Sequence, residues 1–155
     1  MYFFYNGTYS QSIITTIGGN GECWLNDAFA YYGDSAMATN VTICEPSDMA
    51  IDDTGNVYVC DYLNSIIYKI KTSGIMITLA GVPGSIPYNG DNIKADTAHL
   101  SNPVGIIIDK KGNIIFCDEG NFRIRKIDLN GFITTICGNG IQGFSVIMDQ
   151  LQMLR

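Results

Sequence analysis

Five aspartates recur at places where a calcium ion could find carboxylate ligands. Asp52 and Asp109 each begin an Asp-x-x-Gly-Asn run. Such a run predicts a tight hairpin, because Asp can accept hydrogen bonds from the backbone ahead of it and Gly tolerates a positive φ. The chain has no EF-hand-type calcium loop. We therefore interpret the whole set as turn residues and assign no metal ligand: Asp52, Asp53, Asp61, Asp109 and Asp118.

The other candidate catalytic and cofactor motifs are equally sparse. His99 is the single histidine, too few for a multi-histidine metal site or a repeated His-based catalytic group. Gly138-Asn139-Gly140-Ile141-Gln142-Gly143 fits G-x-G-x-x-G. A dinucleotide site also needs a following helix and an acidic residue about 20 positions on. The sequence supplies neither, so we interpret this motif as a turn and assign no catalytic or cofactor-binding residue.

Five cysteines are present, without C-x-x-C or Cys/His zinc spacing. Cys60, Cys117 and Cys137 fall in apolar, strand-like runs, where thiols are commonly buried. Cys23 and Cys44 stand close enough in sequence to be bridged if the chain is secreted. We favour unbridged structural thiols throughout, with the Cys23–Cys44 disulfide as the alternative.

A basic cluster raises the possibility of RNA binding. The net charge of −6 argues against a broad nucleic-acid surface. Nucleic acid is therefore an unfavoured partner. The cluster consists of Lys110, Lys111, Arg123, Arg125 and Lys126.

The elements that position these residues are short apolar runs. Each has strand length and is bounded by turn residues, including Asp109-Lys110-Lys111-Gly112 and Asp128-Leu129-Asn130-Gly131. Four antiparallel strands with short loops predict one meander sheet. The runs are 104–108, 114–117, 122–127 and 132–136.

This unit occurs twice. At a shift of 57 residues, 14 of the 36 positions from 46 to 81 are identical to their partners, against roughly two expected from average composition. Four strands per repeat at a fixed period are typical of a propeller blade. The predicted fold class is all-β, a partial β-propeller with about two full blades.

The residues of the repeat resemble NHL repeats. The shared pattern is Pro-x-Gly, Asp-x-x-Gly-Asn, Asp-x-x-Asn-x-Arg-Ile-Arg-Lys-Ile and Gly-x-Ile-Thr-Thr-Ile-x-Gly. The inserted loops at Gly33-Asp34 and Gly90-Asp91 are similar to those of teneurin-type and microbial NHL propellers. We expect Asp34 and Asp91 to cap a short helical turn.

The repeat divides the chain, 1–155, as one NHL fragment. We expect residues 12–21 to form an outer strand of a preceding blade, 46–81 and 103–138 to form blades, and 139–155 to be the broken start of a further repeat. A closed propeller needs about four to eight blades, and this chain holds fewer than three repeats. We therefore expect a piece of a longer propeller, a truncated gene product or one arc of an oligomeric ring.

The resemblance implies a non-catalytic protein-interaction scaffold whose partner is a protein. The binding surface would lie on the Gly-Asp loops, 22–45 and 82–102. One alternative is a propeller lyase or hydrolase whose catalytic residues lie outside this chain, and another is an RNA-binding NHL propeller.

The compartment stays open at this level. No apolar run approaches the roughly 18 residues of a spanning helix. Asn6-Gly7-Thr8 and Asn40-Val41-Thr42 match the N-glycosylation pattern, which matters only in a secretory context.

Overall fold

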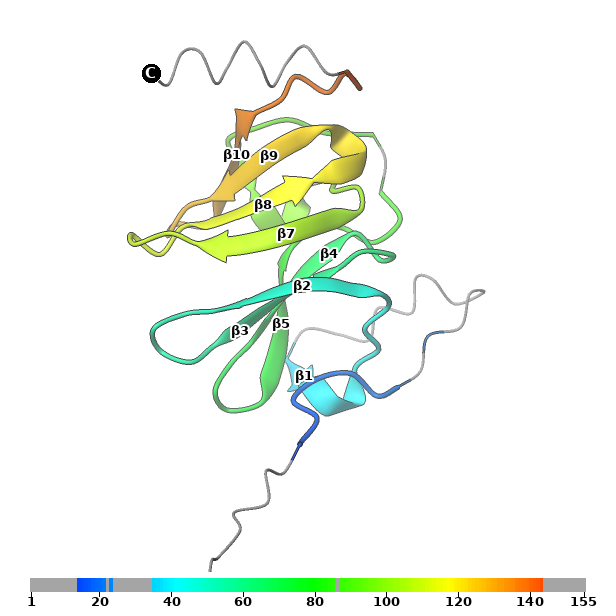
Figure 1. Ribbon diagram of the computed structural model, residues 1–155, viewed down its shortest axis with the longest axis vertical. Helices are drawn as coiled ribbons and strands as arrows, with labels where there is room; N and C mark the ends of the chain where they lie inside the picture. The colour runs from blue at the N-terminus through cyan, green and yellow to red at the C-terminus, as the bar shows by residue number, and fades with distance from the viewer. Residues whose placement is uncertain (1–13, 22, 24–34, 86, 144–155) are drawn as a thin grey trace, which may run out of the picture.

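The computed structural model contains two five-stranded antiparallel sheets, stacked one on the other (Figure 1). Each sheet is a blade, and the all-β, propeller-type fold predicted from the repeat is confirmed. The structure describes residues 14–21, 23, 35–85 and 87–143.

Blade one is a four-stranded meander with a short fifth strand at its outer edge. The order across the sheet is β1-β5-β4-β3-β2. Its strands are β1 (Ala36–Met37), β2 (Pro46–Ile51), β3 (Val57–Asp61), β4 (Ile66–Ile70) and β5 (Ile75–Ala80).

Blade two repeats this order as β6-β10-β9-β8-β7. The four predicted runs all form strands, and each strand begins and ends within one residue of its run. Phe122 falls outside because its φ of 52° ends the preceding turn. The strands are β6 (Ile93–Lys94), β7 (Pro103–Ile108), β8 (Ile114–Asp118), β9 (Arg123–Ile127) and β10 (Phe132–Cys137).

The sequence did not predict the fifth strands. Met37 of β1 pairs with Ile75 of β5, and Lys94 of β6 pairs with Phe132 of β10. At two residues each, they are too short to show an alternating pattern. Each is followed by a single 3-10 turn, as expected. These turns are η1 (Ala38–Asn40) and η2 (Ala95–Thr97), and a third, η3 (Glu119–Asn121), joins β8 to β9.

The hairpin interpretation of Asp52 and Asp109 is confirmed. One carboxylate oxygen of Asp109 accepts from the backbone N–H groups of Lys111 and Asn113, at 2.8 and 2.9 Å. Asp52 accepts the same kind of bond from Asn56 N at 2.9 Å. The side chains of Asn56 and Asn113 also donate to these carboxylates, at 2.8 and 2.7 Å. These side-chain bonds, followed by the backbone bonds, hold the pKa of both aspartates below the ordinary value.

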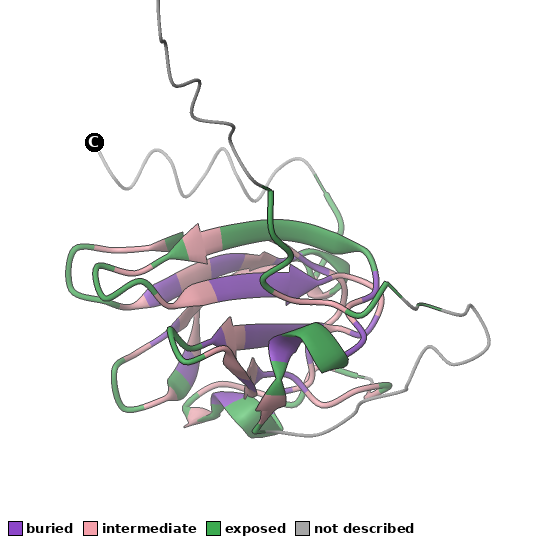
Figure 2. Cartoon of the chain, turned by 90° about the horizontal axis from the view of Figure 1, so that it is seen from below, coloured by how far each residue is buried: buried purple, intermediate pink, exposed green. Residues whose placement is uncertain are grey.

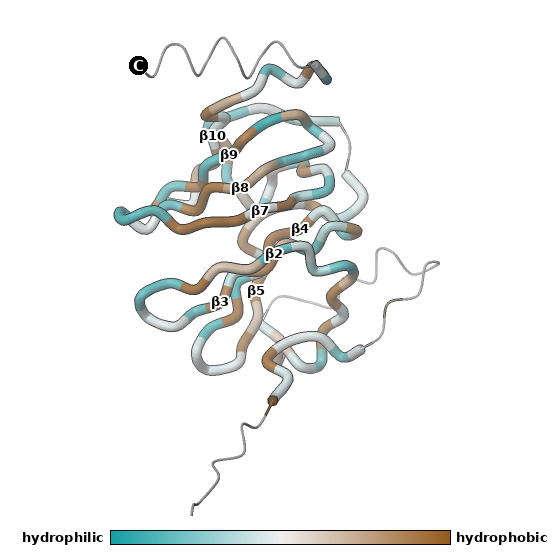
Figure 3. The backbone as a smooth tube through the Cα atoms, viewed as in Figure 1, coloured by the Kyte–Doolittle hydropathy of each residue, from teal (hydrophilic) through white to brown (hydrophobic). Residues whose placement is uncertain are grey.

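The main core lies between the two sheets (Figure 2). Blade one contributes Cys60, Ile67 and Ala80, all 0% exposed, and Phe116 of blade two packs into the same cluster at 1% exposed. The apolar stretches follow the strands, while the β7–β8 hairpin turn is hydrophilic (Figure 3). A second cluster, including Val41, Tyr68 and Met76, lies on the other face of blade one.

The predicted outer strand at 12–21 does not form over its described part. Residues 14–21 contain no strand. The segment instead follows the crossing to blade one, where Gly19 N donates to Ala38 O at 2.9 Å and Asn20 N donates to Val41 O at 3.1 Å. A strand forms only when it pairs with a neighbouring strand through a series of backbone hydrogen bonds. The crossing segment offers residues 14–21 only these two isolated hydrogen bonds. Of the predicted broken repeat, 139–143 form no strand and 144–155 lie outside the described residues.

Candidate interaction surfaces

The loop that crosses from blade one to blade two, 82–102, is held against the sheet by one buried arginine. Arg125 of β9 is 0% exposed. Its Nη1 lies 3.2 Å from Asp118 Oδ2, and its Nη2 lies 3.2 Å from Asp91 Oδ1. Nη2 also donates to Gly90 O at 2.9 Å. A single guanidinium therefore fixes both residues of the Gly-Asp motif to the strands.

Asp91 does not cap a helical turn, so that prediction is wrong. Its Oδ1 accepts from the backbone N–H of Thr135 at 2.7 Å and from the Thr135 hydroxyl at 3.0 Å. The turn η2 begins after Lys94, without a side-chain cap. Asp91 is three residues too early and is drawn to β10 and Arg125. Asp34 lies outside the described residues.

Tyr88 completes the attachment of this loop. The Arg123 guanidinium lies 3.8 Å from the centre of the Tyr88 ring, and that of Arg125 lies 4.9 Å away. Arg123 Nη1 also donates to Asn121 O at 2.7 Å. The predicted basic cluster is thus not a surface patch: its two arginines are engaged with the loop, while Lys110 and Lys111 lie at the β7–β8 hairpin. Sequence reasoning missed this network because it read Arg125 as a surface charge.

A buried aspartate anchors the crossing segment in both blades. Asp61 Oδ2 accepts from Cys44 N at 2.9 Å, and Asp118 Oδ1 accepts from Ser101 N at 2.8 Å. Burial raises the pKa of both carboxyl groups, against the opposing effect of these hydrogen bonds. At the strand position of Arg125, blade one has Tyr68. The buried aspartate is therefore common to both blades, while Arg125 occurs in blade two alone.

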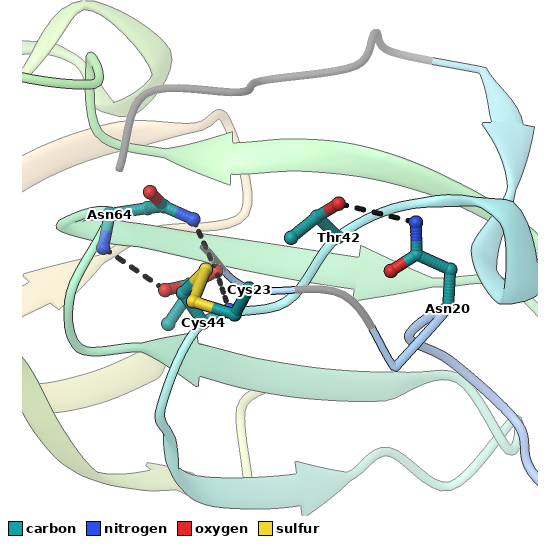
Figure 4. Close-up of a disulfide and its surroundings, with 6 residues drawn as sticks. Asn20, Cys23, Thr42, Cys44 and Asn64 are labelled. Atoms are coloured by element: carbon teal, nitrogen blue, oxygen red, sulfur yellow. Dashed lines mark hydrogen bonds between the residues drawn. A yellow bond between two sulfur atoms is a disulfide. The ribbon is translucent and has the colours of Figure 1, made fainter. Parts of the chain in front are cut away.

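Cys23 and Cys44 form a disulfide, with their Cα atoms 5.4 Å apart (Figure 4). The favoured interpretation, in which all the thiols are unbridged, is wrong for this pair. Because Asp61 holds the Cys44 backbone and Asn64 donates to Asp61 Oδ2 at 2.9 Å, Cys44 occupies a fixed place beside blade one. The remaining described cysteines carry no disulfide.

Polar contacts also join the two blades outside the core. Asp48 Oδ2 accepts from Ile106 N at 2.8 Å, and Ser47 Oγ donates to Pro103 O at 2.8 Å. At the end of the loop, Asn102 N donates to Ser65 Oγ at 3.1 Å. The shift of one repeat places Val104 and Gly105 where blade one has Ser47 and Asp48. Blade two therefore cannot offer the same polar contacts to a neighbour.

Among the residues that the structure describes, no further strand packs on the opposite, largely apolar side of blade two; we name it the outer face of blade two. In blade one, the corresponding residues pack against blade two, and Tyr58, Cys60, Ile67 and Ala80 are buried there. In blade two, Ile107 is 60% exposed and Ile136 is 47% exposed. The apolar residues of the outer face are Ile107, Ile115, Cys117, Ile124, Ile136 and Cys137, and Lys126, which pairs with Ile115, lies on the same side of the sheet.

A hollow of about 200 Å³ borders this face, between Ile124, Cys137 and Ile141. Phe122 and Arg123 line it as well. The sequence held a signal for this surface, since these strand positions are apolar in both repeats. The sequence did not indicate which of the two repeats would have this face covered by a neighbouring blade.

The described residues offer neither a metal cluster nor a membrane-spanning helix. Within 14–21, 23, 35–85 and 87–143, no three His, Cys, Asp or Glu side chains gather in a manner suited to a metal ion. His99 instead places Nδ1 2.8 Å from Pro87 O. No helix in the described part of the chain has the length and hydrophobicity needed to span a membrane.

Comparison with known families finds a match to the teneurin NHL domain over residues 80–146. Teneurin-1 of Gallus gallus is 38% identical over 107 residues, which are 60% of this chain and 4% of that protein. Teneurin-3 of Danio rerio is 36% identical over 143 residues, 79% of this chain and 5% of that protein. The chain thus spans only about a twentieth of the teneurins it matches.

Comparison with solved structures finds virginiamycin B lyase from Staphylococcus aureus. The TM-score is 0.43 and the sequence identity 19%, covering 58% of this chain and 26% of the lyase.

Proposed function

We propose, from the premise that this chain is built of NHL repeats similar to those of teneurins, that it is a non-catalytic protein-interaction scaffold. Two surfaces would serve this role. The outer face of blade two would dock a further blade, and the fixed loop 82–102 would present polar groups to a partner protein.

The observation that carries the proposal is the uncovered outer face. Each of its apolar residues has a counterpart in blade one that faces blade two. Burying apolar surface stabilises a contact by about 25 cal/mol per Å². An exposed apolar sheet face of this kind marks an interaction site.

The occupant that fits this face is another blade of the same repeat. The contact between blade one and blade two is the template, since it covers the corresponding positions with Ala98, Leu100 and Ile106. Because blade two has Val104 and Gly105 in place of Ser47 and Asp48, the new contact would depend on apolar packing. A second copy of this chain can offer such a blade. The contact would then be head-to-tail, since the two faces differ.

The loop 82–102 supports the second half of the proposal. Asp91 and Tyr88 tie it to blade two, while Asn92, Lys94 and Asp96 are exposed. A loop fixed in this way loses little conformational entropy when it binds. It is therefore suited to presenting side chains to a protein partner.

The two competing functions gain less from the described residues. The arginines of the basic cluster hold the loop, so an RNA surface loses its strongest charges. For a lyase or hydrolase, the buried Asp118 and Arg125 are already engaged with one another and with the loop.

The test measures the molar mass of the chain by light scattering after size exclusion, over a range of concentrations. The variant Ile107→Lys/Ile136→Lys places charges on the outer face. Leu129→Lys is the matched control, because Leu129 is 74% exposed but lies in the β9–β10 hairpin turn.

We expect the natural chain and Leu129→Lys to associate as concentration rises, and the outer-face variant to stay monomeric. Circular dichroism checks that all three are folded. A natural chain that remains monomeric throughout, or an outer-face variant that associates equally well, would overturn the proposed docking.

A further inference from the structure

We infer that Asn40 is an N-glycosylation site, in a loop that the Cys23–Cys44 disulfide closes, and that the chain therefore matures in the secretory pathway. Asn40 begins the pattern Asn40-Val41-Thr42. It is the last residue of η1 and is exposed. Its side chain makes no hydrogen bond with the described residues, so the amide is open to solvent.

The other two residues of the pattern face inward. Val41 is 1% exposed and Thr42 is 7% exposed. Thr42 Oγ1 accepts from Asn20 Nδ2 at 3.3 Å, beside the disulfide (Figure 4). The transferase must read Thr42 before the chain folds. After folding, only Asn40 points outward, which is where a bulky glycan can remain without disturbing the core.

The second repeat shows that this outward position is a property of the fold. Thr97 is the partner of Asn40 at the shift of 57 residues, and it too is the exposed last residue of a 3-10 turn. Ala98 is buried, as Val41 is. Position 99 is His99, so the glycosylation pattern is absent there. A glycan at Asn40 would therefore occupy a place that the blade leaves open.

The disulfide is the independent observation. Cys44 is four residues from Asn40, on the same crossing segment. Disulfides form and persist in oxidising compartments such as the endoplasmic reticulum, where N-glycans are also added. The two features require the same compartment, although neither depends on the other chemically.

The experiment expresses the full chain behind a cleavable secretion signal in eukaryotic cells. The secreted and the retained protein are both treated with peptide N-glycosidase F and compared on gels. Asn40→Gln removes the site at an exposed position, and Thr42→Ser keeps the pattern while changing its inward residue. Asn6→Gln removes the other pattern, which lies outside the described residues.

We expect the Asn6→Gln chain to carry one glycan, at Asn40, so that the glycosidase increases its mobility on the gel. The Asn40→Gln/Asn6→Gln chain should carry no glycan and should not shift. Mass spectrometry should then locate the conversion of asparagine to aspartate at position 40. Alkylation without reduction should leave Cys23 and Cys44 unmodified, and reduction should expose both. An Asn6→Gln chain that carries no glycan, or Cys23 and Cys44 that are alkylated without reduction, would overturn the inference.

Discussion

Cys60 and Cys117 occupy the same position in the two blades, yet only Cys60 is sealed from solvent. Cys60 is 0% exposed, because blade two covers it, and burial raises the pKa of its thiol to about 12. Cys117 lies on the outer face of blade two and is half-buried. The difference in exposure between these two cysteines is the effect of covering the same sheet position with a neighbouring blade.

Arg125 should be the most sensitive residue of the loop attachment. Arg125→Met leaves the buried Asp118 without its cation, and removing one partner of a buried pair costs about 3–5 kcal/mol of unfolding free energy. Lys110→Met, at an exposed position of the β7–β8 hairpin turn, is the control and should cost far less. Chemical denaturation at pH 7 measures both.

The same variant should depend on pH in a defined direction. Burial already raises the pKa of Asp118 above its ordinary 3.8, and loss of Arg125 should raise it further. A carboxyl group with a raised folded-state pKa contributes stability below pH 3.8 that is lost as pH rises through the folded value. The deficit of Arg125→Met should therefore shrink between pH 7 and pH 4. A deficit that is unchanged over that range would contradict the assigned ion pair.

Gly138 should tolerate no side chain. Its φ is 89°, and a Cβ atom there would meet Phe122 O and the Cα atom of Arg123. Gly131 has a similar φ of 77° but no atom within 4 Å of the Cβ position. Gly131→Ala should cost about 1–2 kcal/mol from the left-handed backbone alone. Gly138→Ala should cost clearly more, and equal unfolding free energies would show that the close approach is unimportant.

Asp48 should contribute to the contact between the blades. Asp48→Ala removes the acceptor of Ile106 N and should cost about 1–2 kcal/mol. Asp48→Asn retains an oxygen at that position and should cost less. Urea titration distinguishes the two variants. The same loss in both would mean that the charge, rather than the hydrogen bond to Ile106, matters.

The repeat made most of the fold predictable. Strand-length apolar runs and Asp-x-x-Gly-Asn turns located four strands in each blade, because those signals are local. The two-residue strands β1 and β6 carry no such signal, since they form only when the crossing segment meets the outer strand. Over residues 14–21, the described part of the isolated strand predicted at 12–21, no strand forms for the converse reason, because a strand needs a neighbouring strand to pair with.

The candidate surfaces were less predictable. Arg125 sits in a run that reads as charged, and only the packing of Asp91 and Asp118 around it shows that it is buried. The Cys23–Cys44 bridge depends on how Asp61 places Cys44, which spacing alone does not reveal. The Gly-Asp loops were predicted as presenting surfaces, and that role stays a prediction.

The measurement that tests the scaffold most directly is alkylation of the native chain with a maleimide, at a dilute and at an associating concentration. Quantified by peptide mass spectrometry, Cys117 should be modified in the dilute sample and protected when the chain associates, because a docked blade covers the outer face. Cys60 should resist at both concentrations and react only in denaturant. Modification of Cys117 at the same rate at both concentrations would contradict the account.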